Sequence, residues 1–539
     1  MSYISIGKED SRYETLKKGF NQRWPSPGQD AGSIYVCRTV EDAERALQNA
    51  VNQGLRPTVR SGGHCYEGFV SNNSGGVIID IGQLTELSIH DDADNPFYRV
   101  GAGTQNWDGY VNLFKLTGSL PPGGSCYSVG VGGHVVAGGY GLMSRMHGLT
   151  VDWLKAVELL TVGKNGAVER RLVDATNDPD LFKLCRGGGG GNVGIITSYY
   201  FDPLPKAPAK VALLTKQYPW AQFANDKPRF KAFLQAYANY MKRADSDPRT
   251  YGLFTLFKLT HISAGNIGLV VQYTDQNGQL EDTQPLLDLI NAMDSVAEGA
   301  PHTAYMPGTG PLPFARHPVS RQAVGELPEG AIVYDWLYAT QTVNGSGNNQ
   351  RGKYKSSYMK DVFTEHEMDA LFKYLVQKGD GDFSQSLVQV DSYGGAINHK
   401  AAGNNGFDPA ANKTAVFQRN SIMKLQYQTY WTDSANDEKH IQWLRDFYYE
   451  VHRFDGYNGT PYPKSLALPA SRYEGCYIGY PDVDMLTGED PSKPYYNWGE
   501  LYYGPLYKEL VATKNKYDPG RIFRFSMSLG ATPPPVHRG

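Results

Sequence analysis

Two nucleophilic side chains, His64 and Cys126, each stand in a glycine-rich turn of this 539-residue sequence. The first turn reads Arg60-Ser61-Gly62-Gly63-His64, and the second reads Pro122-Gly123-Gly124-Ser125-Cys126. An imidazole and a thiol can bond to electrophilic carbon, and glycine lets a ligand approach the backbone closely. Each residue alone also fits a simpler role, as a hydrogen-bonded loop histidine or a buried structural thiol. Together, the two turns indicate a large cofactor bonded to the protein at two points.

The second turn belongs to a longer segment, residues 121–141, that is unusually dense in glycine. Ordinary helix or strand propensity does not explain such a composition. We interpret the segment as a chain that winds around a cofactor and solvates its phosphates with backbone N–H groups. A purely structural set of turns is the alternative.

A third glycine-rich segment, residues 187–191, consists of five consecutive glycines and is followed by Asn192-Val193-Gly194-Ile195-Ile196. Such a run can lie flat against a ligand and bond phosphate or adenine, although a flexible loop fits it equally well. It is not a Rossmann fingerprint, because a β-branched strand follows the glycines where that motif requires a helix.

Composition and charge exclude several classes of function. The net charge of −3, without a long basic run, argues against nucleic acid or an anionic membrane as a partner. No stretch approaches the roughly 20 apolar residues that span a bilayer, and residues 1–10 lack the apolar core of a secretory signal. We therefore expect a cytoplasmic protein. The cysteines are widely spaced and disfavour both a disulfide framework and a zinc site: Cys37, Cys65, Cys126, Cys185 and Cys476.

The elements that must position these residues divide the chain into three stretches. From about residue 33 to 200, short apolar runs alternate with helical patterns and glycine turns. Thr39 and Asp42 form a capping signature that opens a helix, which Gly54 ends. Residues 57–60, 77–81 and 157–162 are predicted strands, and the first of them leads directly into the His64 turn.

The second stretch begins after a proline-rich crossover at residues 202–208. Alternating apolar runs, as at residues 211–215 and 422–427, predict a large and mostly antiparallel sheet. Helical patterns at residues 230–241 and 438–451 lie between these runs. The last 75 residues return to helix and loop.

Nearly the whole sequence resembles the vanillyl-alcohol-oxidase-type flavoproteins. Within them it is most similar to the berberine-bridge-enzyme-like bicovalent oxidases, including the hexose and carbohydrate oxidases. The resemblance implies an α+β fold. A two-part FAD-binding domain, residues 1–203 and 466–539, would surround a substrate domain, residues 204–465, with a large antiparallel sheet backed by helices. The matching stretches are residues 18–24, 61–67, 122–133, 343–356, 424–431 and 474–484.

The resemblance implies FAD joined through His64 to the 8α carbon and through Cys126 to C6 of the flavin, with Cys65 as a bystander. The flavin would supply redox chemistry that no side chain offers, while the protein fixes its position and potential. With the glycine-rich segments, it predicts these further cofactor-binding residues: Arg60, Ser61, Gly62, Gly63, Gly123, Gly124, Ser125, Val129, Gly130, Gly133, His134, Gly138, Gly141, Gly194 and Ile196.

By the same resemblance, Tyr480 is the catalytic base, and Gly479 stands where the family pattern has Asn. A phenol has an ordinary pKa near 10, so its surroundings must favour the phenolate. Asp391 resembles the assisting carboxylate, which would have to act by hydrogen bond or relay, because its charge alone raises the pKa of the tyrosine. The predicted substrate-site residues are Tyr66, Tyr140, Gln389 and Gln426.

The implied reaction oxidises the C1 hydroxyl of an aldose to the lactone. Hydride passes to the flavin, and O2 is reduced to hydrogen peroxide. Val129 resembles the position, three residues after the cysteine, where a small side chain admits oxygen. Three alternatives stay open: a tailoring oxidase acting on a glycosylated natural product, a carbohydrate dehydrogenase with another electron acceptor, and a non-enzymatic sugar-binding protein whose 37 tyrosines serve in stacking.

Overall fold

The computed structural model describes residues 3–301, 325–343, 349–401, 403, 406–464, 471–487 and 498–531. The predicted domain boundary at residue 465 and part of the matching stretch 343–356 lie outside these residues. Within the described residues, no helix has both the length and the apolar character needed to cross a membrane.

A four-stranded sheet near the N-terminus delivers the His64 turn. Three of its strands are parallel, and β1 joins the edge in the antiparallel sense. The Thr39 side chain accepts a hydrogen bond from Asp42 N, so the predicted capping of the helix is confirmed. In the described residues, the order is β1-β2-β4-β3, and the elements are β1 (Ile4–Gly7), α1 (Tyr13–Leu16), β2 (Ser33–Val36), α2 (Val40–Asn52), β3 (Pro57–Arg60) and β4 (Val77–Asp80).

A second, antiparallel sheet supports the other two glycine-rich segments. Its order in the described residues is β5-β6-β9-β7-β8. The segment 121–141 is not turns alone, because its valines form a short helix, α4. The elements are β5 (Leu87–His90), β6 (Phe97–Gly101), α3 (Asn106–Thr117), α4 (Val131–Val136), α5 (Ser144–His147), β7 (Leu154–Val162), β8 (Val168–Asp174), α6 (Pro179–Cys185) and β9 (Ile195–Phe201).

The third sheet is the large antiparallel one predicted for the middle of the chain. Its order in the described residues is β13-β10-β12-β11-β16-β17-β15, with β14 also paired to β10. Its strands are β10 (Val211–Pro219), β11 (Leu253–Thr260), β12 (Asn266–Tyr273), β13 (Ala300–Pro301), β14 (Ile332–Tyr334), β15 (Arg351–Met359), β16 (Leu387–Ser392) and β17 (Met423–Trp431).

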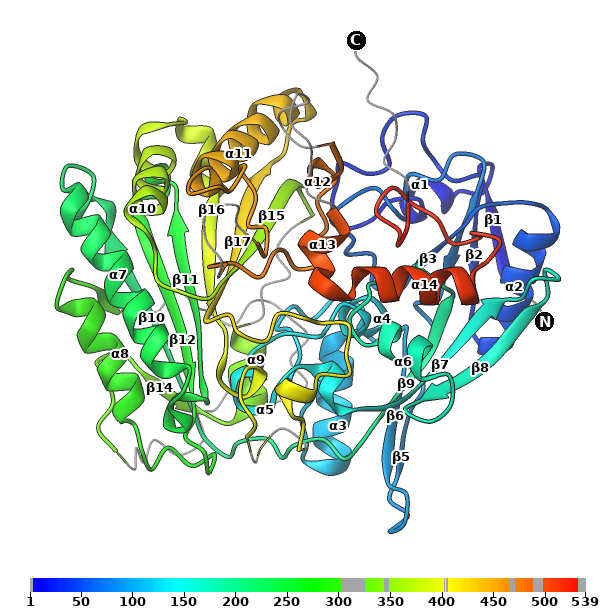
Figure 1. Ribbon diagram of the computed structural model, residues 1–539, viewed down its shortest axis with the longest axis horizontal. Coiled ribbons are helices and arrows are strands. Elements are labelled where there is room, and N and C mark those ends of the chain that lie inside the picture. The colour runs from blue at the N-terminus through cyan, green and yellow to red at the C-terminus, as the bar shows by residue number, and fades with distance from the viewer. Residues whose placement is uncertain are drawn as a thin grey trace.

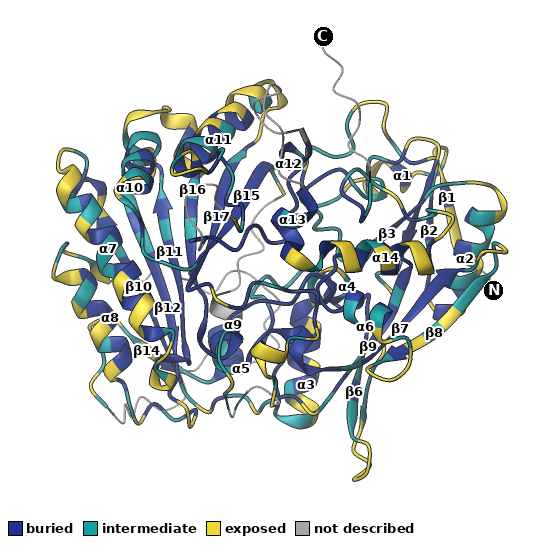
Figure 2. Cartoon of the chain, viewed as in Figure 1, coloured by how far each residue is buried: buried dark blue, intermediate teal, exposed yellow. Residues whose placement is uncertain are grey.

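Helices cover one face of this sheet, as Figure 1 shows. Its strands are largely buried, whereas the outer sides of the helices are exposed (Figure 2). Strand β17 therefore has two buried faces, and its side chains alternate between them: Tyr427 packs on Phe447 and Tyr448 of the helical layer, and Lys424 turns the other way. The helices are α7 (Lys227–Ala244), α8 (Gln284–Asp294), α10 (Glu365–Phe372) and α11 (Asp437–His452); α9 (Trp336–Thr342) lies apart from them, near α3.

The C-terminal helices return to the first part of the chain. They are α12 (Asp484–Thr487), α13 (Trp498–Tyr503) and α14 (Tyr507–Tyr517), and α14 packs on α6. Tyr503 Oη donates a 2.9 Å hydrogen bond to Gly188 O in the five-glycine run. Lys514 donates to Asn192 O just after that run. The α+β fold class is confirmed, while the domain boundaries at residues 203 and 465 stay a prediction.

Buried polar contacts also join the large sheet to the N-terminal half. Arg419 and Asp152 form a two-point ion pair at 2.8 and 3.0 Å, with side chains only 4% and 0% exposed. Arg145 donates to the carbonyl oxygens of Ala244 and Tyr393. Buried polar contacts therefore link the two halves of the molecule.

Candidate active site

The two glycine turns predicted from the sequence meet in space. A β-carbon built on Gly62 would lie 2.3 Å from Gly130 N, which is closer than any side chain can approach. Ser61 Oγ donates a 2.7 Å hydrogen bond to Ala102 O, and Arg60 is fixed by its ion pair with Asp80 at 2.6 Å. Backbone contact, possible only between glycines, therefore sets the separation of the His64 and Cys126 turns.

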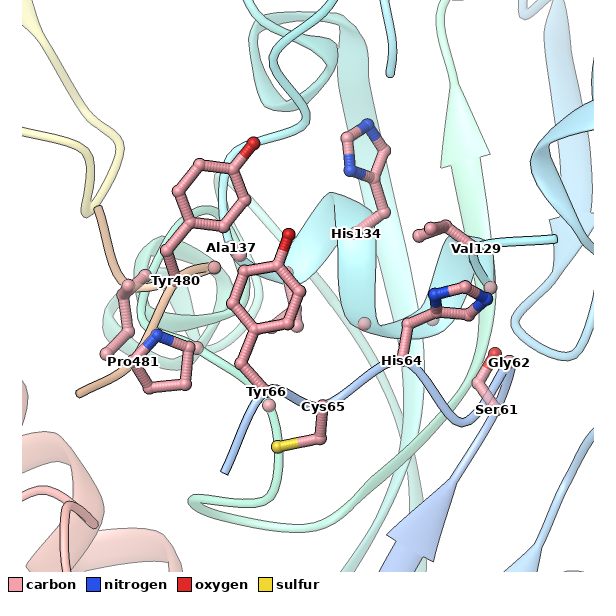
Figure 3. Close-up of a pocket in the computed structure, with 18 of the residues that line it drawn as sticks. Ser61, Gly62, His64, Cys65, Tyr66, Val129, His134, Ala137, Tyr480 and Pro481 are labelled. Atoms are coloured by element: carbon pink, nitrogen blue, oxygen red, sulfur yellow. The ribbon is translucent and has the colours of Figure 1, made fainter. Parts of the chain in front are cut away.

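His64 is held as a neutral imidazole. Burial lowers its pKa to about 4, its ring stacks on Phe20, and its Nε2 lies 2.9 Å from Ser128 Oγ. A neutral imidazole keeps a lone pair, which a nucleophile or ligand-bonding group requires. Figure 3 shows His64 and Tyr66 on the same loop, with Tyr480 on the far side of the Tyr66 ring from His64.

Cys126 and its neighbour Cys65 differ, although both line the same cavity. Burial raises the pKa of the Cys65 thiol to about 12, and its sulfur points away from His64 (Figure 3). Both thiols are partly exposed, but the charge of Cys126 contributes to raising the pKa of Tyr66 and Tyr480, which places it beside both. The geometry therefore favours Cys126 over Cys65 as the second nucleophile.

His134 shapes the cysteine turn. Its Nε2 accepts a 2.8 Å hydrogen bond from Gly124 N, and burial lowers its pKa to about 4, so the ring acts as a neutral acceptor. Tyr110 Oη donates a 2.6 Å bond to Gly124 O. Both polar groups of Gly124 are thus held from one side, which leaves the other side of the turn to the cavity.

A cavity of about 470 Å³ gathers almost all of the predicted site residues. Gly123 and Gly138 are the two that do not line it: they pack on Tyr110 and Val416 instead. The predicted residues in the lining are Arg60, Ser61, Gly62, Gly63, His64, Tyr66, Gly124, Ser125, Cys126, Val129, Gly130, Gly133, His134, Tyr140, Gly141, Gly194, Ile196, Gln389, Asp391, Gln426 and Tyr480.

The lining suits a flat, extended cofactor that carries phosphates. Glycines from all three glycine-rich segments turn bare backbone toward the space, and a β-carbon built on Gly133 would meet no atom within 4 Å. Gly189 and Gly191 take positive φ angles of 80° and 71°, which other residues adopt only at a cost. The two nucleophiles stand in the wall of this same cavity. The residues present therefore fit such a group.

The large sheet supplies the opposite wall through side chains. Strands β16 and β17 pair in a register that sets Gln389 opposite Gln426 and Asp391 opposite Lys424. Gln389 Nε2 donates to Asp391 Oδ1 at 2.9 Å, and Gln426 Nε2 donates to Tyr66 Oη at 2.9 Å. This wall is polar, with amides and charges suited to a polyhydroxylated ligand.

Lys424 is a functional candidate to which the sequence reasoning assigned no role. Its Nζ lies 3.0 Å from Asp391 Oδ2 and 3.4 Å from Tyr480 Oη. It also lies 4.0 Å from the ring centroid of Tyr140, and its side chain is 1% exposed. The sequence does contain this information. Lys424 is two positions from Gln426 in a predicted strand, so the two side chains share one face.

The surroundings of Tyr480 disfavour its phenolate form unless a cation lies close to the phenolic oxygen. Burial raises its pKa well above the ordinary value, and the charge of Asp391 adds to the rise. Lys424 is the neighbour that favours the phenolate. Asp391, whose own pKa burial raises against the effect of Lys424, thus reaches Tyr480 through the ammonium group.

Three further tyrosines, Tyr66, Tyr140 and Tyr354, line the cavity near Tyr480. The rings of Tyr66 and Tyr480 lie side by side with centroids 5.2 Å apart, and Tyr354 stacks on Tyr66 at 3.6 Å. Tyr140 donates its hydroxyl to Ser392 O, so its ring, not its oxygen, faces Lys424. A β-carbon on Gly479 would lie 2.5 Å from the Tyr477 ring, so an asparagine there would displace that ring.

Comparison with known proteins explains this construction. Residues 32–170 match the family model described as "FAD binding domain", and residues 476–530 match "Berberine and berberine like". Hexose oxidase of Chondrus crispus is 36% identical over 97% of this chain and 94% of its own length. The chain belongs to this family of FAD-linked oxidases. Its cofactor is FAD, and the glycine-lined cavity is where the described residues fit it.

Other members of the berberine-bridge-enzyme-like family match over equally long stretches. Aclacinomycin-N/aclacinomycin-A oxidase of Streptomyces galilaeus is 30% identical over 98% of this chain and 89% of its own length. The crystal structure of a glycopeptide hexose oxidase in complex with teicoplanin superposes with a TM-score of 0.81, at 28% identity, over 98% of this chain and 99% of that one. This FAD-dependent oxidoreductase therefore shares its whole architecture with enzymes of the family.

Proposed function

We propose that this oxidoreductase is a carbohydrate oxidase that converts the C1 hydroxyl of an aldose to the lactone and uses O2 as its acceptor. The observation that carries the proposal is the contact chain Tyr480, Lys424, Asp391 inside the FAD cavity. These three side chains, which we assign as base, cation and carboxylate, line the same cavity as His64 and Cys126. The 36% identity to a hexose oxidase supports the substrate class.

Proton removal is the task of the protein. Tyr480 takes the proton of the anomeric hydroxyl on its phenolic oxygen, and Lys424 Nζ, 3.4 Å from that oxygen, favours the phenolate that this step requires. Asp391 orients Lys424 through their 3.0 Å ion pair. When bound, FAD accepts the two electrons released from C1 and transfers them to O2, which gives hydrogen peroxide.

The polar wall orients the sugar. Gln389, Gln426 and Gln428 line the cavity from adjacent strands, and their amides can both donate to and accept from sugar hydroxyls. Tyr66 and Tyr140 add apolar ring surface. Val129, a small side chain beside His64, leaves room for O2 near the cofactor (Figure 3).

A substrate screen with peroxide detection tests the function. We expect peroxide to form with at least one of glucose, galactose, lactose and cellobiose, and the product to be the corresponding lactone or aldonic acid. Formation of peroxide without oxidation at C1, or no turnover of any of the four sugars, would contradict the proposal. Bleaching of the flavin by sugar without oxygen consumption would indicate a dehydrogenase.

Oxidation of a glycosylated natural product is the second candidate. The aclacinomycin oxidase and the glycopeptide hexose oxidase that was solved with teicoplanin share the architecture over most of their length. The same screen, extended to a glycosylated aromatic polyketide, separates the candidates by the ratio of kcat/KM for the glycoside to that for the free sugar.

We further propose that FAD is attached twice, at 8α through His64 and at C6 through Cys126. We expect Cys126→Ser to keep a yellow chromophore after acid precipitation, because the His64 bond remains, while the double variant His64→Ala with Cys126→Ser loses it. Absorbance of the washed pellet measures the effect. The matched control is Cys65→Ser. Cys65 directly follows His64, but its sulfur points away from it, so this variant should retain both bonds to the flavin. Loss of colour in Cys126→Ser alone would contradict attachment through His64.

A further inference from the structure

A buried cluster of charged side chains lies on the helix side of strand β15, behind the cavity wall. Three of the stretches that match the family, residues 61–67, 343–356 and 474–484, contribute to it, although the proposed chemistry uses none of these contributions. Lys353, Glu67 and Asp482 are each 2% exposed, and Lys355 is 0% exposed. The members are Glu67, Lys353, Lys355, Arg445, Asp482 and Asp484, which carry three positive and three negative charges.

Lys353 is the cation that joins the most distant parts of the chain in this cluster. Its Nζ lies 3.0 Å from Glu67 Oε1, 2.5 Å from Asp482 Oδ1 and 3.3 Å from Asp484 Oδ2. Lys355 Nζ contacts Asp482 and Asp484 at 2.8 and 2.9 Å. Of these two lysines, Lys353 is the one that reaches Glu67.

Each partner of Lys353 is linked through the backbone to a tyrosine at the catalytic end of the cavity. Glu67 directly follows Tyr66, and Asp482 is two residues after Tyr480. Tyr354, the neighbour of Lys353, lies on the opposite face of β15 and stacks on Tyr66 at 3.6 Å and 12°. One ammonium group therefore ties together the three segments that carry these rings.

Holding segments together through buried charges costs free energy of desolvation. Buried ion pairs lose hydration that their mutual attraction barely repays, and apolar residues of similar size often stabilise a fold at least as well. What ion pairs add is direction, because the oxygen atoms must meet the ammonium protons at fixed angles and distances. Glu67 Oε2 has no hydrogen-bond partner among the described residues. Its Oε1 accepts from Lys353 Nζ at 3.0 Å and from Val483 N at 3.4 Å, so the charged link to Lys353 is the shorter of the two that hold this turn.

We propose that Lys353 is a positioning residue that sets the separation of the Tyr66 and Tyr480 rings by binding Glu67 and Asp482 at once. The role of these rings in catalysis rests on the proposed function, whereas the geometric effect does not. A base displaced by about 1 Å from its target can lose two orders of magnitude in rate. The cluster thus acts on the reaction through Tyr480 and touches no substrate itself.

The decisive variant is the double substitution Glu67→Gln with Lys353→Met. It removes one anion and one cation, so Lys355 and Arg445 still balance Asp482 and Asp484 and the fold is retained. We expect flavin bleaching by saturating sugar to slow by about 10²-fold. Reoxidation by O2, which needs neither tyrosine, keeps its rate. In the crystal structure of the holoenzyme variant, the ring centroids move from their 5.2 Å separation.

The control is Arg419→Met, which breaks an equally buried ion pair between the two halves of the molecule, remote from the tyrosines. It should lower thermal stability without changing the bleaching rate per bound flavin. A double variant that keeps the 5.2 Å separation overturns the proposal, whatever its rate. Should no sugar bleach the wild-type flavin, the proposed function fails, and the ring separation in the variant still decides the role of Lys353.

Discussion

Replacing Tyr480 with Phe is expected to lower the rate of flavin bleaching by sugar by about 10³-fold while the flavin stays bound. Only the phenolic oxygen is lost, and general-base catalysis by one side chain contributes about 10²- to 10⁴-fold. The ring keeps its contacts with Tyr66 and Tyr477, at 5.2 and 4.8 Å. Anaerobic stopped-flow absorbance with saturating sugar measures the rate directly.

The matched control for this variant is Tyr358→Phe. Tyr358 is fully buried and lies near Tyr477, but it is outside the cavity lining. The flavin of the Tyr358→Phe variant should be bleached by sugar at the wild-type rate. Near-normal bleaching in Tyr480→Phe would refute the assignment of Tyr480 as the base.

Replacing Lys424 with Met should shift the dependence of the bleaching rate on pH toward alkaline values. Burial and the charge of Asp391 raise the pKa of Tyr480, and the Lys424 ammonium at 3.4 Å opposes them by favouring the phenolate. Without it the pKa rises, so less phenolate is present at any pH below that value. An opposite charge at this distance shifts a pKa by about 1 to 3 units, so the rate at neutral pH falls by about 10- to 10³-fold and recovers as the pH increases.

The single variant leaves Asp391 buried without its cation. A double variant, Lys424→Met with Asp391→Asn, removes both charges and separates the loss of the ammonium from the unpaired carboxylate. It should show a smaller alkaline shift than Lys424→Met, because burial continues to raise the pKa of Tyr480 but the charge of Asp391 no longer adds to the rise. A pH profile identical to that of the wild type in both variants would exclude Lys424 from control of the base.

The sequence predicted the cofactor end of the site better than the catalytic end, for a physical reason. The part of the cavity that binds the cofactor is built from turns that require glycine. Such turns can be recognised directly in the sequence. His64 and Cys126 were found because such turns surround them, and the close contact of Gly62 with Gly130 explains why both must be glycine. Gly123 and Gly138, which belong to the same segment but pack on Tyr110 and Val416, show that density of glycine does not distinguish lining from packing.

Lys424 and Lys353 illustrate what local patterns miss. Both sit in strands where alternation is visible, yet a lysine in a strand is ordinarily a solvent-facing residue. Their partners lie far away in the chain: Tyr480 for Lys424, and Glu67 with Asp482 for Lys353. Such pairing arises only from the packing of three distant segments. The helix at Val131–Val136 was also missed, because its glycines masked the helical spacing of its valines.

The cavity has two kinds of wall, which differ in how readily their residues can be substituted. The close contact between Gly62 and Gly130 belongs to the first kind. One wall is backbone, and a side chain at Gly62 or Gly130 would push the His64 and Cys126 turns apart. The other is a set of side chains, Gln389, Gln426, Gln428 and Lys258, on the face of an antiparallel sheet whose hydrogen bonds do not depend on them. Substrate preference can therefore drift residue by residue on β11, β16 and β17 while the flavin stays in place. A single scaffold can in this way serve free sugars in one lineage and decorated aromatic glycosides in another.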